Sequence, residues 1–133
     1  AIAPLSDVSK LKVYDLANFI NGQGGVLIPE NTIKRVPTAE LRNNQTDEQS
    51  LGASYDIISP LVDEIVEECK TLAELSKKYP EKIVKHISQL INQNEYKRRQ
   101  AAPGIKVTKK AFGIGRRIPI SHKFTNIKFN RYG

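Results

Sequence analysis

The residue types best suited to binding chemistry gather late in the chain, where Glu95-Tyr-Lys-Arg-Arg opens a strongly basic segment. Residues 95–133 hold 11 Lys or Arg against the single acid Glu95, a net charge of +10, whereas residues 1–94 carry a net charge of −3. Such a segment favours polyanions: nucleotide phosphates, nucleic acid or an acidic membrane surface. A solvated tail without a partner has the same composition, so charge indicates only the sign of a ligand.

Lys97 lies two helical turns beyond the apolar pair Leu90 and Ile91, where a buried helix leaves the core. A lysine at that point can direct its ammonium group at a bound anion. Alternatively, Lys97, Arg98 and Arg99 decorate the exposed end of a helix, where cations also suit the helix dipole. The residues alone favour this second interpretation.

Several familiar catalytic and binding motifs are absent. His86, His122 and the single Cys69 lack the spacing of metal ligands. The chain has no Gly-x-Ser-x-Gly nucleophile, no Walker A loop and no aromatic or Gly-x-x-Gly RNA-binding motif. The cluster Gly22-Gln-Gly-Gly follows an expected helix, so we interpret it as a helix end and turn rather than a phosphate loop.

Helices are expected to position these residues. The first follows Ser6-Asp7, either of which can cap it, and stops at the glycine cluster. Residues 26–36 fit a short strand or one helical turn equally well. The polar stretch 43–50 has no apolar side chain and is typical of a disordered segment or a functional loop such as a lid.

Three more helices are expected further on. Apolar pairs recur every four residues between Ile57 and Val66, on a helix that begins at Ser59 or just before, because proline is tolerated only in a first turn. Thr71-Leu-Ala-Glu74 has the form of a capping box, which opens a short helix to Tyr79. Pro80 starts a helix that continues through Gln100 and stops at Pro103-Gly104. Residues 105–108 and 117–120 are expected to be extended.

Composition sets the broad class. The 133 residues, 39% of them hydrophobic, suffice for one domain with a modest core, and no apolar run approaches the ~18 residues of a membrane helix. A single cysteine suits a reducing compartment. Because the chain has no Met and opens within an apolar stretch at Ala1, we expect it to be a piece of a longer protein, with apolar surface exposed around residues 1–5 and 26–29.

Several segments together resemble NAD synthetase, in order and at sensible spacing over most of the chain. They are Ala3-Pro-Leu-Ser-Asp-Val-Ser-Lys-Leu-Lys-Val-Tyr, Pro37-Thr-Ala-Glu-Leu-Arg, Asn44-Gln-Thr-Asp-Glu-Gln-Ser-Leu-Gly, Ser54-Tyr-Asp, Glu95-Tyr-Lys-Arg-Arg-Gln-Ala-Ala-Pro-Gly, Lys106-Val-Thr, Ala111-Phe-Gly and Arg116-Arg-Ile-Pro-Ile. The Tyr-Lys-Arg-Arg form resembles the glutamine-dependent bacterial branch.

The resemblance implies a cytoplasmic, homo-oligomeric ligase with a Rossmann-like α/β domain of the ATP pyrophosphatase type. With ATP and Mg2+, such an enzyme transfers AMP to the carboxylate of deamido-NAD, and ammonia from glutamine then displaces AMP to give NAD. It implies partners that are small molecules, with neither nucleic acid nor membrane. Residues 1–133 would form the C-terminal part of that domain, mostly helical with a few short strands: a helical part over 1–104 with a lid loop near 40–55, and a basic extended tail over 105–133.

Residue by residue, the resemblance implies that Lys10 and Thr38 bind ATP and that Tyr96 and Lys97 bind deamido-NAD. Ser50 stands where ammonia-dependent relatives often carry Glu, so it receives no role. The family's Ser-Gly-Gly-x-Asp-Ser pyrophosphate loop and its magnesium ligands are not found in these residues, so we assign them no catalytic or metal-binding group and expect the piece alone to be inactive. The remaining alternative is a small, non-enzymatic, RNA- or phosphate-binding module.

Overall fold

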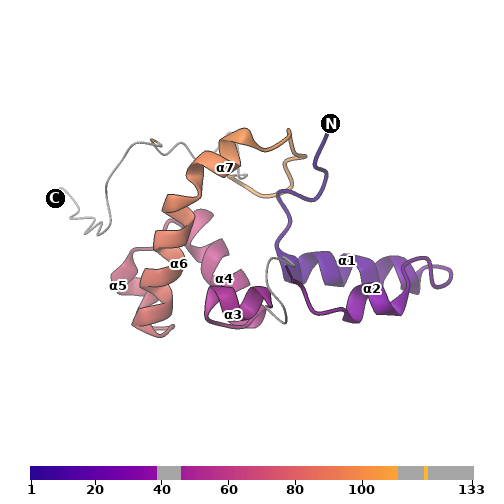
Figure 1. Cartoon of the computed structure of the whole chain (residues 1–133), viewed down its shortest axis with the longest axis horizontal. Coiled ribbons are helices and arrows are strands. Elements are labelled where there is room, and N and C mark those ends of the chain that lie inside the picture. Colours follow the sequence, from indigo (N-terminus) through magenta and orange to yellow (C-terminus); the bar gives the residue numbers. More distant parts are fainter. Residues whose placement is uncertain (39–45, 111–118, 120–133) are drawn as a thin grey trace. The chain divides into compact units, whose positions relative to one another are not determined.

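The computed structural model describes residues 1–38, 46–110 and 119 (Figure 1). Helices dominate these residues, as predicted. The few short strands expected with them do not form within the described ranges, where extended pairing is limited to one isolated parallel bridge between Ala3 and Gly104. The expectation for residues 117–120 falls largely outside the described residues. The helices are α1 (Lys10–Gly22), α2 (Glu30–Lys34), α3 (Asp47–Leu51), α4 (Tyr55–Val66), α5 (Leu72–Leu75), α6 (Glu81–Gln93) and α7 (Glu95–Gln100).

The chain forms two compact units. One spans Val8–Ser59, and the other combines Ala1–Asp7 with Pro60–Gly133. We call them the α1 unit and the α6 unit. Helix α4 supplies its first residues to the α1 unit and the rest to the α6 unit.

Helix α1 opens the α1 unit, and its start differs from the prediction. Its N-cap residue is Ser9, whose side chain makes no capping hydrogen bond. The proposed cap Asp7 is instead engaged by residues near the end of the described chain, so a long-range contact takes precedence over the local one. The predicted end at Gly22 is confirmed. Asn21 closes the following turn: its Oδ1 accepts from the Ile28 N–H at 2.8 Å, and its Nδ2 donates to the Ile28 carbonyl at 2.8 Å.

The ambiguous segment and the polar stretch both contribute short helices. Residues 30–34 are helical, which selects the helical turn over the strand. Within the stretch predicted as a loop, α3 forms because Thr46 and Gln49 make a reciprocal capping box, and Gly52 ends it with a left-handed φ of 78°. The capping chemistry was present in the sequence, but the lack of apolar side chains hid it. Residues 43–45 lie outside the described ranges.

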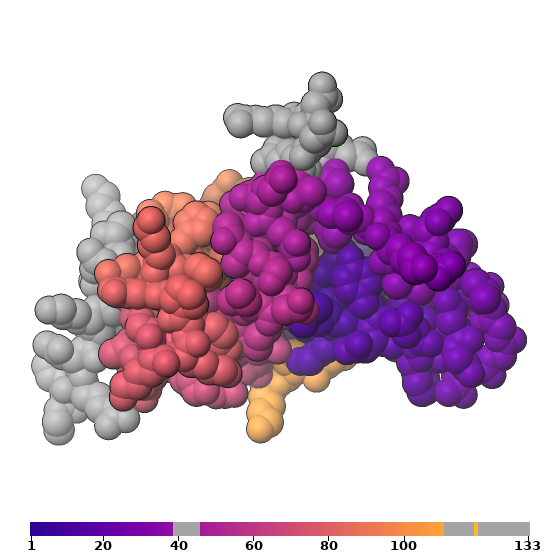
Figure 2. Space-filling view, turned by 90° about the horizontal axis from the view of Figure 1, so that it is seen from below, coloured from indigo at the N-terminus to yellow at the C-terminus, as the bar shows by residue number. Residues whose placement is uncertain are grey.

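Apolar side chains of the α1 unit remain at its surface. Helix α1 has no buried residue, and its Phe19 is 62% exposed. In the turn after it, Val26 is 77% and Leu27 76% exposed, as expected for residues 26–29. Figure 2 shows one face of this unit, in indigo and purple, on which the side chains of α1, α2 and the turn between them lie at the surface.

Helix α4 begins earlier than Pro60 led us to expect. It starts at Tyr55, because the Glu48 carboxylate accepts the Tyr55 N–H at 2.8 Å and so holds the first turn from outside the helix. Pro60 therefore lies in the second turn and leaves the Asp56 carbonyl without its helical donor. Asp56 is exposed, so water can serve that carbonyl.

The core of the α6 unit lies among α4, α5 and α6. Its buried apolar residues are Leu61, Val66, Leu75, Val84 and Ile87. The predicted capping box at Thr71 and Glu74 is confirmed, as is the apolar stripe of α6. The helix that the box opens ends at Leu75 rather than at Tyr79. The stripe packs against α5, with α7 on the far end of α6 (Figure 1). The expected continuous helix to Gln100 is wrong, because the chain breaks at Asn94, whose side chain bonds back to the Leu90 carbonyl.

A buried carboxylate joins α4 to the segment after α5. Glu64 is 7% exposed and binds the ammonium groups of Lys70 and Lys78 and the hydroxyl of Tyr79. Hydrogen bonds from Lys78 first, and then from Lys70, lower the pKa of Glu64 to about 2. The charge is thus compensated on several sides, as a buried carboxylate requires.

Candidate functional site

Lys10 lies at the first position of α1, with its side chain held over an aromatic ring. Its Nζ is 5.2 Å from the centre of the Tyr14 ring. Four residues separate them, so they share a helix face, and the ring attracts the cation through its quadrupole. Lys10 is half-buried and has a defined direction as it emerges from α1.

Thr38 lies in the same unit, exposed, at the end of the described segment that precedes α3. The carbonyl of its neighbour Pro37 accepts the Asp47 N–H at 3.0 Å. Thr38 is therefore anchored next to the start of α3, the helix that the polar stretch forms.

Asp47 connects this anchor to the half-buried phenol of Tyr55. Tyr55 donates its hydroxyl to Asp47 Oδ2 at 3.2 Å. Burial, followed by the neighbouring Asp47 carboxylate, raises the pKa of Tyr55 to about 12, with smaller contributions from Tyr14 and Glu48. Hydrogen bonds thus connect the residue before Thr38 to Tyr55 through Asp47, whereas Lys10 contacts Tyr14. The structure places both predicted ATP-binding residues, Lys10 and Thr38, in the α1 unit.

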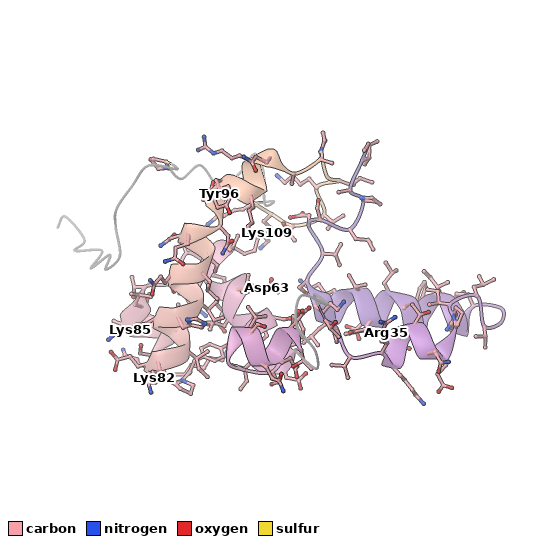
Figure 3. All side chains as sticks on the ribbon, in the orientation of Figure 1. Arg35, Asp63, Lys82, Lys85, Tyr96 and Lys109 are labelled. Atoms are coloured by element: carbon pink, nitrogen blue, oxygen red, sulfur yellow. The ribbon has the colours of Figure 1, made fainter. Side chains whose placement is uncertain are left out.

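Tyr96 and Lys97 lie in the other unit, on α7. Both are exposed, and Figure 3 marks Tyr96 where α7 follows α6. The Lys97 ammonium makes no ion pair with any residue that the structure describes, unlike the adjacent arginines, which bind Glu95. Because Lys10 and Thr38 belong to the α1 unit, the convergence of all four residues stays a prediction.

Sequence reasoning missed one partner residue in each unit: Tyr14, whose ring contacts the Lys10 ammonium, and Glu95, which binds Arg98 and Arg99. In both cases the signal was present in the sequence as i,i+4 or i,i+3 spacing between a cation and its partner. Spacing of this kind is common on helix surfaces, so the sequence alone does not separate a buried pair such as Glu95–Arg98 from an exposed one such as Glu81–Lys85.

The described ranges do not gather three or more His, Cys, Asp or Glu side chains in a geometry that could hold a metal ion. These residues therefore do not fit a magnesium site, and no metal-dependent step is assigned to them. Within the same ranges, every helix is too short or too polar to cross a bilayer.

Comparison with known proteins identifies the family. The sequence model of the NAD synthase family matches residues 1–101, and the chain belongs to that family. The glutamine-dependent NAD(+) synthetase of Xanthomonas campestris pv. campestris (strain 8004) is 41% identical over 125 residues, covering 92% of this chain and 22% of the relative. The corresponding synthetase of Thermotoga maritima is 39% identical over 124 residues, covering 92% of this chain and 21% of the relative.

A solved structure, that of glutamine-dependent NAD+ synthetase from Acinetobacter baumannii in complex with adenosine diphosphate, superposes with a TM-score of 0.48 at 32% identity. It covers 86% of this chain and 19% of the solved one. The predicted resemblance is thus confirmed by sequence. The chain spans about a fifth of the length of the curated relatives that it matches, 22% for the first of them.

Proposed function

We propose that this chain works as part of a glutamine-dependent NAD synthetase. The family match over residues 1–101 carries the proposal, and full-length relatives named for that activity are 41% and 39% identical. The alternative of a basic RNA- or phosphate-binding module rests on the charge of residues 95–133 alone and is not favoured. The proposal includes that the complete enzyme is a homo-oligomer and works in the cytoplasm.

The chemistry explains why such residues are needed. A carboxylate is a poor electrophile, so deamido-NAD attacks the α-phosphorus of ATP, forms an acyl adenylate and releases pyrophosphate. Ammonia then adds to the acyl carbon, AMP leaves, and the amide of NAD remains. Two polyanions must be held close together, which requires cations and hydrogen-bond donors placed before the reaction starts.

Within this scheme, Lys10 and Thr38 are proposed to hold ATP. A lysine oriented by the Tyr14 ring and a threonine anchored beside α3 would supply an ammonium and a hydroxyl to the nucleotide. Tyr96 and Lys97 are proposed to hold deamido-NAD, with Lys97 as the cation, because its ammonium has no acid partner among the described residues. The polar stretch 43–50 would close over the nucleotides.

The fold proposal is that these residues form the C-terminal part of a Rossmann-like α/β domain of the ATP pyrophosphatase type. The family match over residues 1–101 supports it. The described residues themselves contribute only one isolated parallel bridge, between Ala3 and Gly104. The rest of the sheet and the magnesium ligands are proposed to come from polypeptide beyond these 133 residues.

The decisive experiment measures NAD formation by the complete protein from ATP, deamido-NAD and either glutamine or ammonia. We expect ATP-dependent NAD production, and no production by residues 1–133 alone. In Lys97→Ala the KM for deamido-NAD should rise by about tenfold or more, the scale of one lost charged hydrogen bond, while the KM for ATP changes far less. A complete protein that makes no NAD would overturn the proposal.

A further inference from the structure

Glu95 is the most deeply buried charged residue that the structure describes, and the two residues that follow it are exposed. It is 2% exposed at the first position of α7, followed directly by Tyr96 and Lys97. An ionised carboxylate is costly to bury unless cations and hydrogen-bond donors surround it. A buried acid in a basic segment therefore requires a reason.

Two arginines of the same short helix supply the compensation. Arg98 binds Glu95 through two nitrogens: Nε reaches Oε2 at 3.0 Å, and a terminal nitrogen reaches Oε1. The Arg98 side chain is itself only 12% exposed. Arg99 Nε adds a longer contact of 3.7 Å to Oε1. The two-pronged pair with Arg98 compensates the charges of both partners, so the face of α7 that carries them can stay buried.

Helix geometry places Lys97 on the opposite side. Positions i+3 and i+4 share a face with Glu95, whereas position i+2 lies about 200° around the helix. The acid thus engages the two arginines and leaves the ammonium of Lys97 without an acid partner among the described residues. Of the three consecutive cations, Arg98 and Arg99 thus bind Glu95, and Lys97 is exposed on the opposite face.

We propose that Glu95 is a positioning residue for the dinucleotide site: by pairing with Arg98 and Arg99 it keeps its own face of α7 buried, and so presents Lys97, on the opposite face, to deamido-NAD. This inference rests on the proposed function and adds a residue to it. Glu95 touches no substrate in this arrangement and acts through the direction that it gives Lys97.

The test uses the complete enzyme and four variants: Glu95→Gln, Lys97→Ala, the double variant, and Glu81→Gln as a control. Glu81 forms an i,i+4 pair with Lys85 on the exposed face of α6, so the control removes the same charge from a helix without touching α7. Gln at position 95 keeps two polar atoms for the arginines and removes only the charge, which limits the damage to folding.

Glu95→Gln is expected to raise the KM for deamido-NAD about tenfold, the scale of a small misplacement of a binding group, with the KM for ATP little changed. The decisive arm is the double variant. If Glu95 acts through Lys97, adding Glu95→Gln to Lys97→Ala changes the KM no further; independent roles would multiply. Glu81→Gln should match the wild type, and melting temperatures recorded in parallel separate stability from binding.

Multiplying effects in the double variant, or equal changes in both KM values, would overturn the inference and leave the proposed function intact. Absence of NAD formation by the wild type would overturn the proposed function and the inference with it. Should Glu95→Gln fail to fold, Arg98→Lys loosens the same pair from the other side and keeps its charge. It is expected to give the same selective rise in the KM for deamido-NAD, and an unchanged KM would count against the role.

Discussion

The Asp7 carboxylate accepts hydrogen bonds from the backbone N–H and the hydroxyl of Thr108, 101 residues later in the chain, at 2.8 Å and 2.9 Å. It also accepts the Val107 N–H at 2.8 Å. Asp7 is 8% exposed. Three donors on one buried carboxylate hold the start of the segment after α7 against the N-terminal residues.

Removing this carboxylate should release that segment. Asp7→Ala leaves two backbone N–H groups and one hydroxyl without their acceptor, and it should cost about 2–4 kcal/mol of stability against about 1 kcal/mol for Thr108→Val. Hydrogen exchange monitored by mass spectrometry should show faster exchange at residues 101–110 in Asp7→Ala. Unchanged protection there would show that other contacts hold the segment.

Glu64 makes the stability of the α6 unit depend on pH in the acid range. Its pKa is lowered to about 2 by Lys78 and Lys70, so the folded state favours the carboxylate. The associated stability is present above the ordinary pKa of a glutamate and disappears as the pH falls through about 2. Glu64→Gln should unfold more easily at neutral pH and lose less stability on acidification than the wild type, as measured by denaturant titration at several pH values. Parallel curves for the two proteins would contradict this.

Tyr55 should titrate unusually late. Burial and then the Asp47 carboxylate raise its pKa to about 12, so the folded protein retains the phenol proton after the unfolded chain has lost it. Stability is complete below the ordinary tyrosine pKa and falls as the pH rises toward about 12. Ultraviolet phenolate titration should show a late transition that Tyr55→Phe removes and Asp47→Asn shifts to lower pH. An unshifted transition in Asp47→Asn would exclude the carboxylate as a cause.

Tyr14 should affect ATP binding through Lys10. The cation–π contact needs the ring but not the hydroxyl, so Tyr14→Phe should behave like the wild type. Tyr14→Leu keeps apolar volume but removes the ring, and a contact worth about 0.5–1 kcal/mol predicts a two- to five-fold higher KM for ATP in the complete enzyme. The KM for deamido-NAD serves as the internal control. Equal behaviour of the Phe and Leu variants would show that the ring does not orient Lys10.

Local chemistry determined much of this fold from sequence alone. The capping box at Thr71 and Glu74, the glycine stop at Gly22 and the apolar stripe around Val84 all appear in the structure as predicted. Each depends on residues within one or two turns of each other, so their physics is complete in a short window. The family could likewise be identified from sequence, because its motifs are contiguous.

Tertiary structure decided wherever a distant group outweighed the local preference. Ser6 or Asp7 was predicted as the cap of the first helix; Asp7 instead accepts hydrogen bonds from Val107 and Thr108, because three donors stabilise a carboxylate more than one helix end does. Helix α4 starts before Pro60 because Glu48, on another helix, holds its first turn. Glu95 could be seen from sequence only as the last acid before a basic segment. Its burial together with Arg98 depends on tertiary structure, in which α7 packs on α6. An acid and an arginine three residues apart are common on helices, and only burial shows that this pair compensates a charge inside the protein.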